Sequence, residues 1–120
     1  MRPLIDHLRR FADRTAVLTD TTELTYRQLA DRVEACAPTL GERRALVLLE
    51  CSNDIDTLTH YLAAVAAGHV VLPVPAGGDT AALTATYQPD VIVDRTGVHH
   101  RDSGGHALHP DLMLLMSTSG

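Results

Sequence analysis

The chain has 120 residues, of which 45% are hydrophobic, and its formal net charge is −5. This length supports one compact domain with a buried core and is too short for two. A net negative chain with one Phe and three Tyr lacks the basic surface and stacking platforms that nucleic-acid binding requires, so no nucleic-acid partner is expected. All ten basic residues are Arg, and the lack of Lys excludes a phosphate-loop lysine, a Schiff base and a lysine base within this chain.

Residues 1–40 predict two helices with a short pair of strands between them. Apolar positions 4, 5, 8 and 11 fall on one face of an N-terminal helix. Residues 15–19 and 23–25 are typical of two short strands joined by a turn. Thr25 and Gln28 have the spacing of a capping box at the start of a second helix, which Pro38 helps to stop.

Beyond residue 44, apolar strand patterns alternate with helical patterns. Four continuous apolar runs predict buried strands, at 45–49, 70–74, 91–93 and 112–116. Residues 95–110 lack periodicity and predict a surface loop. Strands that alternate with helices imply right-handed crossovers and a parallel sheet. The predicted fold class is therefore α/β, a parallel sheet with helices on both faces in Rossmann-like layers, preceded by an N-terminal helix and a short β-hairpin.

Single residues mark the ends of these predicted elements. Asn53 can cap the helix that follows the first buried strand, and Gly68 suits the left-handed position at its end. Asp79 is a plausible N-cap for the next helix. Pro73 and Pro75 mark either the exit of their strand or an edge of the sheet.

Nothing in the sequence predicts a secretory signal or a membrane span. The first eleven residues carry several charged side chains, unlike a signal peptide. The longest apolar stretch, 61–77, is interrupted by Gly and Pro and is unsuited to crossing a membrane. We therefore expect a cytoplasmic protein.

The two cysteines, Cys36 and Cys51, supply neither a disulfide framework nor a set of metal ligands. Cys36 lies in a helical pattern and Cys51 ends an apolar run, so we interpret both as buried small hydrophobes in a reducing compartment. The alternative for Cys51 is a nucleophile at a strand end, although no histidine is placed by the sequence to activate it.

Histidine and aspartate side chains offer further candidate sites. Four histidines at 99, 100, 106 and 109 fall within one predicted loop, which is either a solvated loop or an incidental metal site. Asp54 and Asp56 form a carboxylate pair, but their place in the first turn of a helix explains them through the helix dipole. Asp90 and Asp94 flank a predicted strand and are interpreted as turn residues.

The sequence ends with Ser117, Thr118, Ser119 and Gly120, directly after the predicted strand at 112–116. Ligands of parallel α/β sheets bind at the carboxyl ends of strands, where hydroxyls and flexible amides can cradle an anion. Four small residues after a strand also form ordinary turns, so both interpretations stay open. The segment is not a P-loop, because that motif needs Gly, four residues, Gly and then Lys.

Three segments, taken in order, resemble the core motifs of the adenylate-forming (AMP-binding) enzymes. This superfamily includes acyl-CoA synthetases, adenylation domains of nonribosomal peptide synthetases, and luciferases. Residues 24–29, Leu-Thr-Tyr-Arg-Gln-Leu, resemble the first motif. Residues 62–74, a helix end followed by Gly, a strand and Pro, resemble the second. Residues 112–120, Leu-Met-Leu-Leu-Met-Ser-Thr-Ser-Gly, resemble the start of the third, so the resemblance covers nearly the whole chain.

The resemblance implies an ATP-dependent ligase. In such enzymes a substrate carboxylate attacks the α-phosphate of ATP, pyrophosphate leaves, and the acyl group passes to a thiol of coenzyme A or of a carrier protein. ATP and Mg²⁺ are the implied cofactors, and residues Ser117, Thr118, Ser119 and Gly120 are the implied donors to the β- and γ-phosphates. An acyl-CoA synthetase-like parent is favoured, because Met-Ser-Thr-Ser-Gly lacks the Tyr-Thr-Ser-Gly usual in peptide synthetases.

The family's loop lysine, its Mg²⁺-binding Glu, its ribose-binding Asp and its catalytic Lys belong to later motifs. The resemblance therefore implies that residues 1–120 are the N-terminal portion of a larger adenylate-forming domain, ending inside the phosphate-binding loop. We expect this piece to be catalytically incompetent alone and, with a strand edge left unpaired, to self-associate. The alternative is a free-standing, non-catalytic α/β module that binds a protein partner or a nucleotide.

Overall fold

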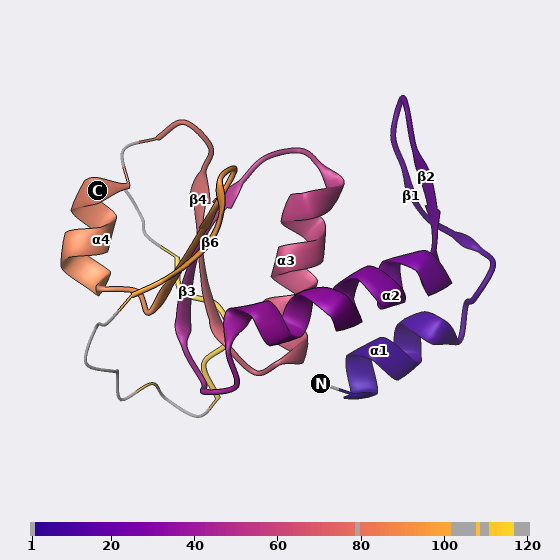
Figure 1. Cartoon of the computed structure of the whole chain (residues 1–120), viewed down its shortest axis with the longest axis horizontal. Helices are drawn as coiled ribbons and strands as arrows, with labels where there is room; N and C mark the ends of the chain where they lie inside the picture. Colours follow the sequence, from indigo (N-terminus) through magenta and orange to yellow (C-terminus); the bar gives the residue numbers. More distant parts are fainter. Residues whose placement is uncertain (1, 79, 102–107, 109–110, 117–120) are drawn as a thin grey trace.

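The computed structural model describes residues 2–78, 80–101, 108 and 111–116. In chain order the elements are α1 (Arg2–Arg9), β1 (Thr15–Leu18), β2 (Glu23–Thr25), α2 (Tyr26–Cys36), the 3₁₀-helix η1 (Ala37–Leu40), β3 (Leu46–Cys51), α3 (Ile55–Ala66), β4 (Val70–Pro75), α4 (Ala81–Tyr87), β5 (Val91–Asp94) and β6 (Gly97–His100). The predicted α/β class is confirmed (Figure 1). Within the described ranges, no helix has the length and apolar character needed to cross a membrane.

The N-terminal part is held together by a helix cap and an ion-pair cluster. The hydroxyl of Thr25 accepts a hydrogen bond from the Gln28 amide at 3.2 Å, and the Gln28 side chain accepts one from the Thr25 amide at 2.9 Å. This is the predicted capping box, and it begins α2 directly after the antiparallel β1–β2 hairpin. Arg9 joins α1 to α2 by contacting both Asp31 and Glu34.

The main sheet has the strand order β4-β3-β5-β6. β3 is parallel to β4 and β5, as predicted, but β6 is antiparallel to β5, so the sheet is mixed rather than purely parallel. β6 also lies inside the stretch that the sequence predicted to be a loop. The turn from Asp94 to Gly97 explains the direction, because a two-residue connection can join only antiparallel strands, whereas a parallel pair needs a long crossover.

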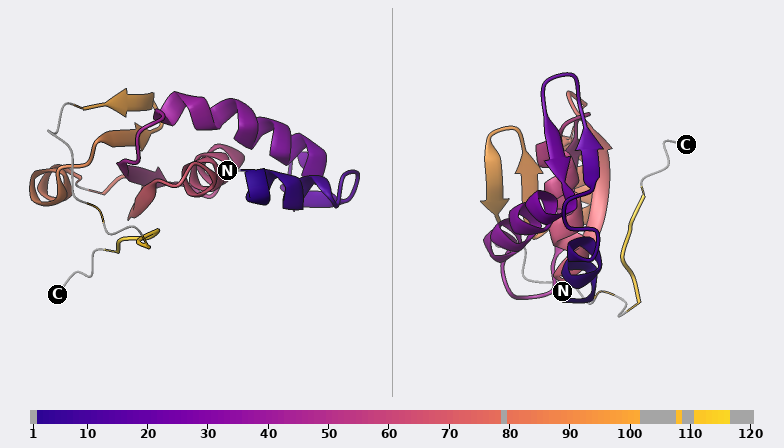
Figure 2. Two further views of the ribbon diagram at one scale, coloured as in Figure 1. Left: turned by 90° about the horizontal axis from the view of Figure 1, so that it is seen from below. Right: turned by 90° about the vertical axis from the view of Figure 1, so that its right-hand side faces the viewer.

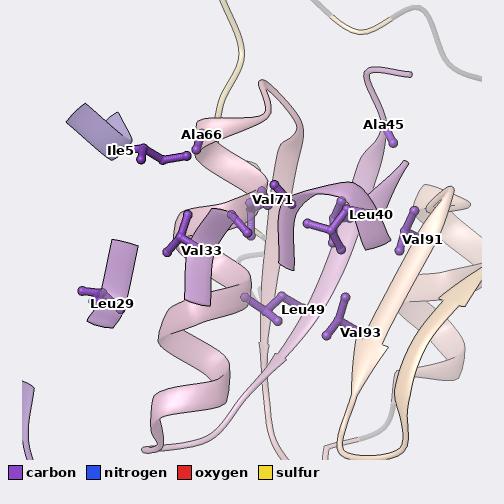
Figure 3. Packing of buried hydrophobic residues seen from close by; sticks show 14 of the residues in the cluster. Ile5, Leu29, Val33, Leu40, Ala45, Leu49, Ala66, Val71, Val91 and Val93 are labelled. Carbon is purple, nitrogen blue, oxygen red and sulfur yellow. The ribbon is translucent and has the colours of Figure 1, made fainter. Parts of the chain in front are cut away.

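Helices cover both faces of the sheet, as predicted. α2, α3 and η1 pack on one face, against inward-pointing residues such as Leu49, Val71 and Val93 (Figure 3). α4 lies on the other face, where Leu83 and Tyr87 pack against the alternate side chains of β3 and β4 (Figure 1). Because both faces are buried, these strands are continuously apolar and show no alternation.

The segment 112–116 is not the full strand that its sequence predicts. It joins the sheet by one parallel bridge, between Val71 and Leu114, on the outer side of β4 (Figure 2). The Val71 amide donates to Met113 O, and the Leu115 amide donates to Val71 O. The next outward position on β4 is Pro73, which has no N–H to donate, so this ladder ends after one bridge. Pro73 thus marks an edge of the β3–β6 sheet, one of the two predicted alternatives.

Two predicted helix caps are wrong, and one helix end is confirmed. Asp54, not Asn53, is the N-cap of α3. The N-cap of α4 is Thr80, which makes no side-chain cap hydrogen bond, and the predicted cap Asp79 lies outside the described residues. Gly68 ends α3 with a φ of 82°, in the left-handed region as predicted.

Candidate functional site

The carboxyl ends of β3, β4 and β5 lie at one edge of the sheet because the three strands are parallel. Cys51 at the end of β3 pairs in register with Pro75 at the end of β4, and β5 ends beside them at Asp94. In sheets of this kind, ligands bind at this edge. The candidate site is therefore built from the segments that follow these strands.

A cavity of about 270 Å³ opens at this edge, between the loop after β3 and the turn after β5. Its polar lining consists of Glu50, Ser52, Asp54, Asp56, Thr57, His60, Asp94, Arg95 and Thr96. Carboxylates outnumber cationic groups in this lining, so the local field disfavours a polyphosphate. This cavity does not fit ATP phosphates.

The loop after β3 is fixed by its own hydrogen bonds. The Asp54 carboxylate accepts from the Thr57 amide at 2.8 Å, and the Thr57 hydroxyl accepts from the Ser52 amide at 3.0 Å. Asp56 lies in the first turn of α3. The prediction that Asp54 and Asp56 serve the start of a helix is confirmed for both positions.

The turn after β5 is organised by the Asp94 carboxylate. One of its oxygens accepts from the Thr96 amide at 2.9 Å and from the Thr96 hydroxyl at 2.6 Å, and it lies 3.2 Å from His99 Nε2. These contacts, the Thr96 hydroxyl foremost, hold the pKa of Asp94 below its usual range. Asp94 is therefore the turn residue that the sequence predicts. Asp90 has another role, because its side chain accepts from the Leu46 amide and anchors β5 beside β3.

The histidines of the predicted loop are separated by the fold. His99 faces Asp94, whereas His100 Nε2 donates to the carbonyl of Thr39 at 2.8 Å. His106 and His109 lie outside the described residues. Across the part of the chain that the structure describes, no group of three or more His, Cys, Asp or Glu side chains gathers to hold a metal ion.

The predicted phosphate-binding residues Ser117, Thr118, Ser119 and Gly120 lie outside the described residues. The segment 112–116, which precedes them, is held in place by hydrogen bonds. Arg44 donates to the carbonyls of Gly68 and Leu112, at 2.6 and 2.8 Å, and so ties the end of α3 to the segment 112–116. The parallel bridge to Val71 directs this segment along β4, toward the edge where the strands end.

His69 is a buried polar residue that the sequence analysis did not single out. It is only 1% exposed, and its Nδ1 accepts from the Ala45 amide at 3.1 Å, so the neutral ring carries its proton on Nε2. That Nε2 makes no well-formed hydrogen bond with the described residues, although the backbone of Gly41 interacts with the ring. Burial lowers the pKa of His69. Its sequence neighbours give no signal of this, because the ring meets Ala45, which is distant in the chain.

Both cysteines are free thiols that pack against the core, as predicted for small hydrophobes, but both are only half-buried. Burial raises the pKa of Cys51, which argues against the nucleophile alternative at that position. Cys36 at the end of α2 and His60 of α3 line the same groove, an arrangement that the sequence did not predict. Only the packing of the two helices reveals it.

No protein-family model matches the sequence, and no curated protein matches it. Among solved structures, the chain is similar to the N-terminal subdomain of Klebsiella oxytoca NpsA in complex with 3-hydroxybenzoyl-AMSN, with a TM-score of 0.69 and 19% identity over 97% of this chain and 29% of that one. It is also similar to NpsA-ThdA, an artificially fused adenylation–PCP di-domain from the same organism, with a TM-score of 0.67 and 22% identity over 95% of this chain and 22% of that one.

A further similar structure is the nonribosomal peptide synthetase FmoA3 in an AMPPNP-bound form, with a TM-score of 0.69 and 23% identity over 94% of this chain and 12% of that one. The chain thus spans less than a third of the length of each of these proteins. At these identities the likeness shows the fold, which is that of the N-terminal part of adenylation-domain structures.

Proposed function

We propose that this chain is the N-terminal portion of an ATP-dependent ligase that activates a carboxylic acid as an acyl-adenylate. The observation that supports this most directly is the likeness of nearly the whole chain to the N-terminal subdomain of an adenylation protein. The three segments that resemble the family's motifs each lie at a defined position in the fold. Residues 24–29 span the β2–α2 junction, residues 62–74 span the end of α3 and β4, and residues 112–116 lie beside β4.

The proposed chemistry requires donors for the phosphates of ATP. We assign this role to the hydroxyls and backbone amides of Ser117, Thr118, Ser119 and Gly120, because the preceding segment runs toward the carboxyl edge of the sheet. The acidic cavity beside β5 is unsuited to the same task. The phosphates are therefore expected on the β4 side of the site.

The chain does not contain every group that adenylation needs. Charge develops at the α-phosphate in the transition state and must be balanced by cations. The sequence has no Lys to supply such a cation. We therefore propose that the 120-residue chain is catalytically incompetent by itself and that the remaining groups belong to a longer enzyme.

The acceptor of the activated acyl group is proposed to be the thiol of coenzyme A or of a carrier protein. Ser117 stands where peptide-synthetase domains usually carry Tyr before Thr-Ser-Gly, which favours an acyl-CoA synthetase-like parent. One of the similar solved structures, by contrast, is an adenylation–PCP fusion. Thiol-trapping with coenzyme A and with a phosphopantetheinylated carrier protein would distinguish these acceptors.

ATP–pyrophosphate exchange with a panel of carboxylic acids tests the proposal. The 120-residue chain should show no exchange above background, whereas the product of a longer reading frame should exchange with its cognate acid. Thr118→Ala in that longer product should reduce exchange by roughly tenfold or more, because it removes a phosphate donor. Ser52→Ala is the matched control, a hydroxyl on the acidic cavity, and should leave exchange unchanged.

Two results would contradict the proposed function. Exchange catalysed by the 120-residue chain itself would show that it already holds the catalytic groups. A stop codon directly after Gly120 would instead support a free-standing module that binds a protein partner or a nucleotide.

A further inference from the structure

Arg44 lies just before β3, at the edge of the sheet where the parallel strands begin, and its guanidinium joins two segments that are distant in the chain. Its Nη1 donates to the carbonyl of Gly68 at 2.6 Å, and its Nη2 donates to the carbonyl of Leu112 at 2.8 Å. A guanidinium is a planar fork with its donors in fixed directions, so it can hold two acceptors at a set separation. Arg44 therefore ties the start of the segment 112–116 to the end of α3.

The backbone beside Arg44 is itself fixed to the sheet. The amide of the next residue, Ala45, donates to His69 Nδ1 at 3.1 Å, and the Ala45 carbonyl accepts from the Val70 amide at 2.9 Å. These bonds hold the chain next to Arg44 against the beginning of β4. The guanidinium thus reaches out from a fixed base, and the segment that begins at Leu112 is the part that it positions.

The ladder between the segment 112–116 and β4 is short. In its one parallel bridge, the Val71 amide donates to the Met113 carbonyl at 2.9 Å and the Leu115 amide donates to the Val71 carbonyl at 2.8 Å. Pro73, the next outward position on β4, has no N–H to extend it. A second attachment therefore has a large effect on how often the segment is docked along β4.

Side-chain packing holds the segment 112–116 only in part. Leu112 and Leu115 are half-buried against the cluster beneath α4, whereas the other three side chains are exposed. The two hydrogen bonds from Arg44 are charge-assisted, and such bonds are about twice as strong as neutral ones. Arg44 thus supplies the second attachment that the short ladder lacks.

The docked segment leads from the Arg44 edge of the sheet toward the opposite, carboxyl edge (Figure 2). Leu114 lies level with Val71, and β4 ends four residues later at Pro75. Each residue of extended chain adds about 3.3 Å, so the segment covers most of the distance between the two edges. Arg44 therefore acts on the carboxyl edge through this segment and not by touching a ligand there.

We propose that Arg44 is a positioning residue for ATP, because it docks the segment that carries Ser117, Thr118, Ser119 and Gly120. This inference rests on the proposed function, in which those four residues donate to the β- and γ-phosphates. Molecules with an undocked segment bind ATP weakly, so the apparent affinity falls in proportion to the docked fraction. Bound ATP selects the docked form, and the chemical step then proceeds at its usual rate.

ATP–pyrophosphate exchange by the product of a longer reading frame, with ATP varied at a saturating concentration of the cognate acid, tests this role. Arg44→Met, which keeps the length of the side chain but removes its donors, should raise the KM for ATP about tenfold and leave kcat within about twofold. Arg43→Met removes the same charge from the exposed neighbouring residue and should leave both constants unchanged. Arg44→Lys, which keeps the charge but not the fork, should raise this KM by only about threefold.

Amide hydrogen exchange in the 120-residue chain measures docking without any catalysis. The Val71 amide donates to the docked segment, whereas the Val70 amide donates to Ala45 within the sheet. Arg44→Met should speed exchange at Val71 by about tenfold and leave exchange at Val70 unchanged. Val70 therefore serves as a control for general loosening of β4.

Three results would overturn the inference while leaving the proposed function intact. The first is a lower kcat at unchanged KM in Arg44→Met, because a loss of folded enzyme alone gives that pattern. The second is an equal rise in KM in Arg43→Met, because loss of charge then explains the effect. The third is unchanged exchange at Val71 in Arg44→Met. A wild-type longer product that exchanges with no acid would instead refute the proposed function, and the inference with it.

Discussion

Acidification from about pH 7.5 to about pH 5.5 is expected to weaken the fold through His69, whose imidazole is buried between β3 and the end of α3. Protonation would place a hydrogen on Nδ1, which now accepts from the Ala45 amide, and would leave a charge without solvent. The nearby Arg44 guanidinium adds repulsion to this desolvation. The native state therefore resists the proton, and the pKa of His69 is lowered.

The sign and size of the effect follow from this lowered pKa. In the unfolded chain His69 titrates near its ordinary value of about 6.5. Above that pH both states are neutral and the full stability is present. As the pH falls below it, only the unfolded chain binds the proton, so the free energy of unfolding falls until the native ring titrates. One proton over one pH unit corresponds to about 1.4 kcal/mol, and this is the upper limit of the loss between about pH 7.5 and pH 5.5.

Urea unfolding monitored by circular dichroism at both pH values checks this magnitude. His69→Asn is the informative variant, because its side-chain oxygen can replace Nδ1 as the acceptor for the Ala45 amide but cannot titrate. The variant is less stable at both pH values, since the smaller side chain leaves space in the core. Its loss of stability on acidification should be smaller than that of the wild type, by up to about 1.4 kcal/mol.

His60 provides a control of opposite sign. Its pKa is raised, so its contribution is fully present below about pH 6.5 and is lost as the pH rises through the native value. His60→Gln should therefore enlarge the acid-induced loss, whereas His69→Asn should reduce it. If His69→Asn loses as much stability on acidification as the wild type, the buried imidazole is not the cause and the reasoning is refuted.

Two further predictions concern the segment 112–116. Arg44→Met should free this segment from the end of α3 and speed amide hydrogen exchange at Leu115 by about tenfold or more. Arg43→Met, at the exposed neighbouring residue, should leave this exchange unchanged. Equal exchange in both variants would show that the bridge to β4 alone holds the segment. The exposed side chains of Met113, Leu114 and Met116 beside this edge should promote self-association, which light scattering at high protein concentration would detect. Met116→Lys should reduce this self-association more than Leu18→Lys, a control on the β1–β2 hairpin. A monodisperse wild-type monomer would contradict the second prediction.

Local signals in the sequence located several elements correctly. Thr25 and Gln28 interact across three residues, so their capping box depends on little beyond its own turn. Gly68 ends α3 because the left-handed conformation suits a residue without a Cβ. The apolar runs of β3 and β4 reflect burial on both faces and predicted a sheet between two helical layers.

Other local sequence patterns allowed more than one interpretation or predicted the wrong element. Asn53 and Asp54 are both good caps, and the choice between them follows from how Thr57 holds the loop after β3. β6 is a short edge strand that carries two histidines, which an edge strand tolerates because it can face solvent. Its sequence therefore lacks the apolar pattern of a buried strand and predicted a loop. The apolar run at 112–116 predicted a strand, but Pro73 removes the N–H that would continue the ladder.

The sequence by itself determined where most helices and strands lie, since those signals arise from neighbouring residues and from burial periodicity. Only the tertiary structure decided the strand order, the burial of His69 and the placement of Cys36 and His60 along one groove. Each of these depends on residues that are distant in the chain and close in space. Hydrophobic periodicity indicates how deeply a segment is buried, but it does not indicate which other segment packs against it. The packing of one segment on another decides where the chemical groups of this protein lie.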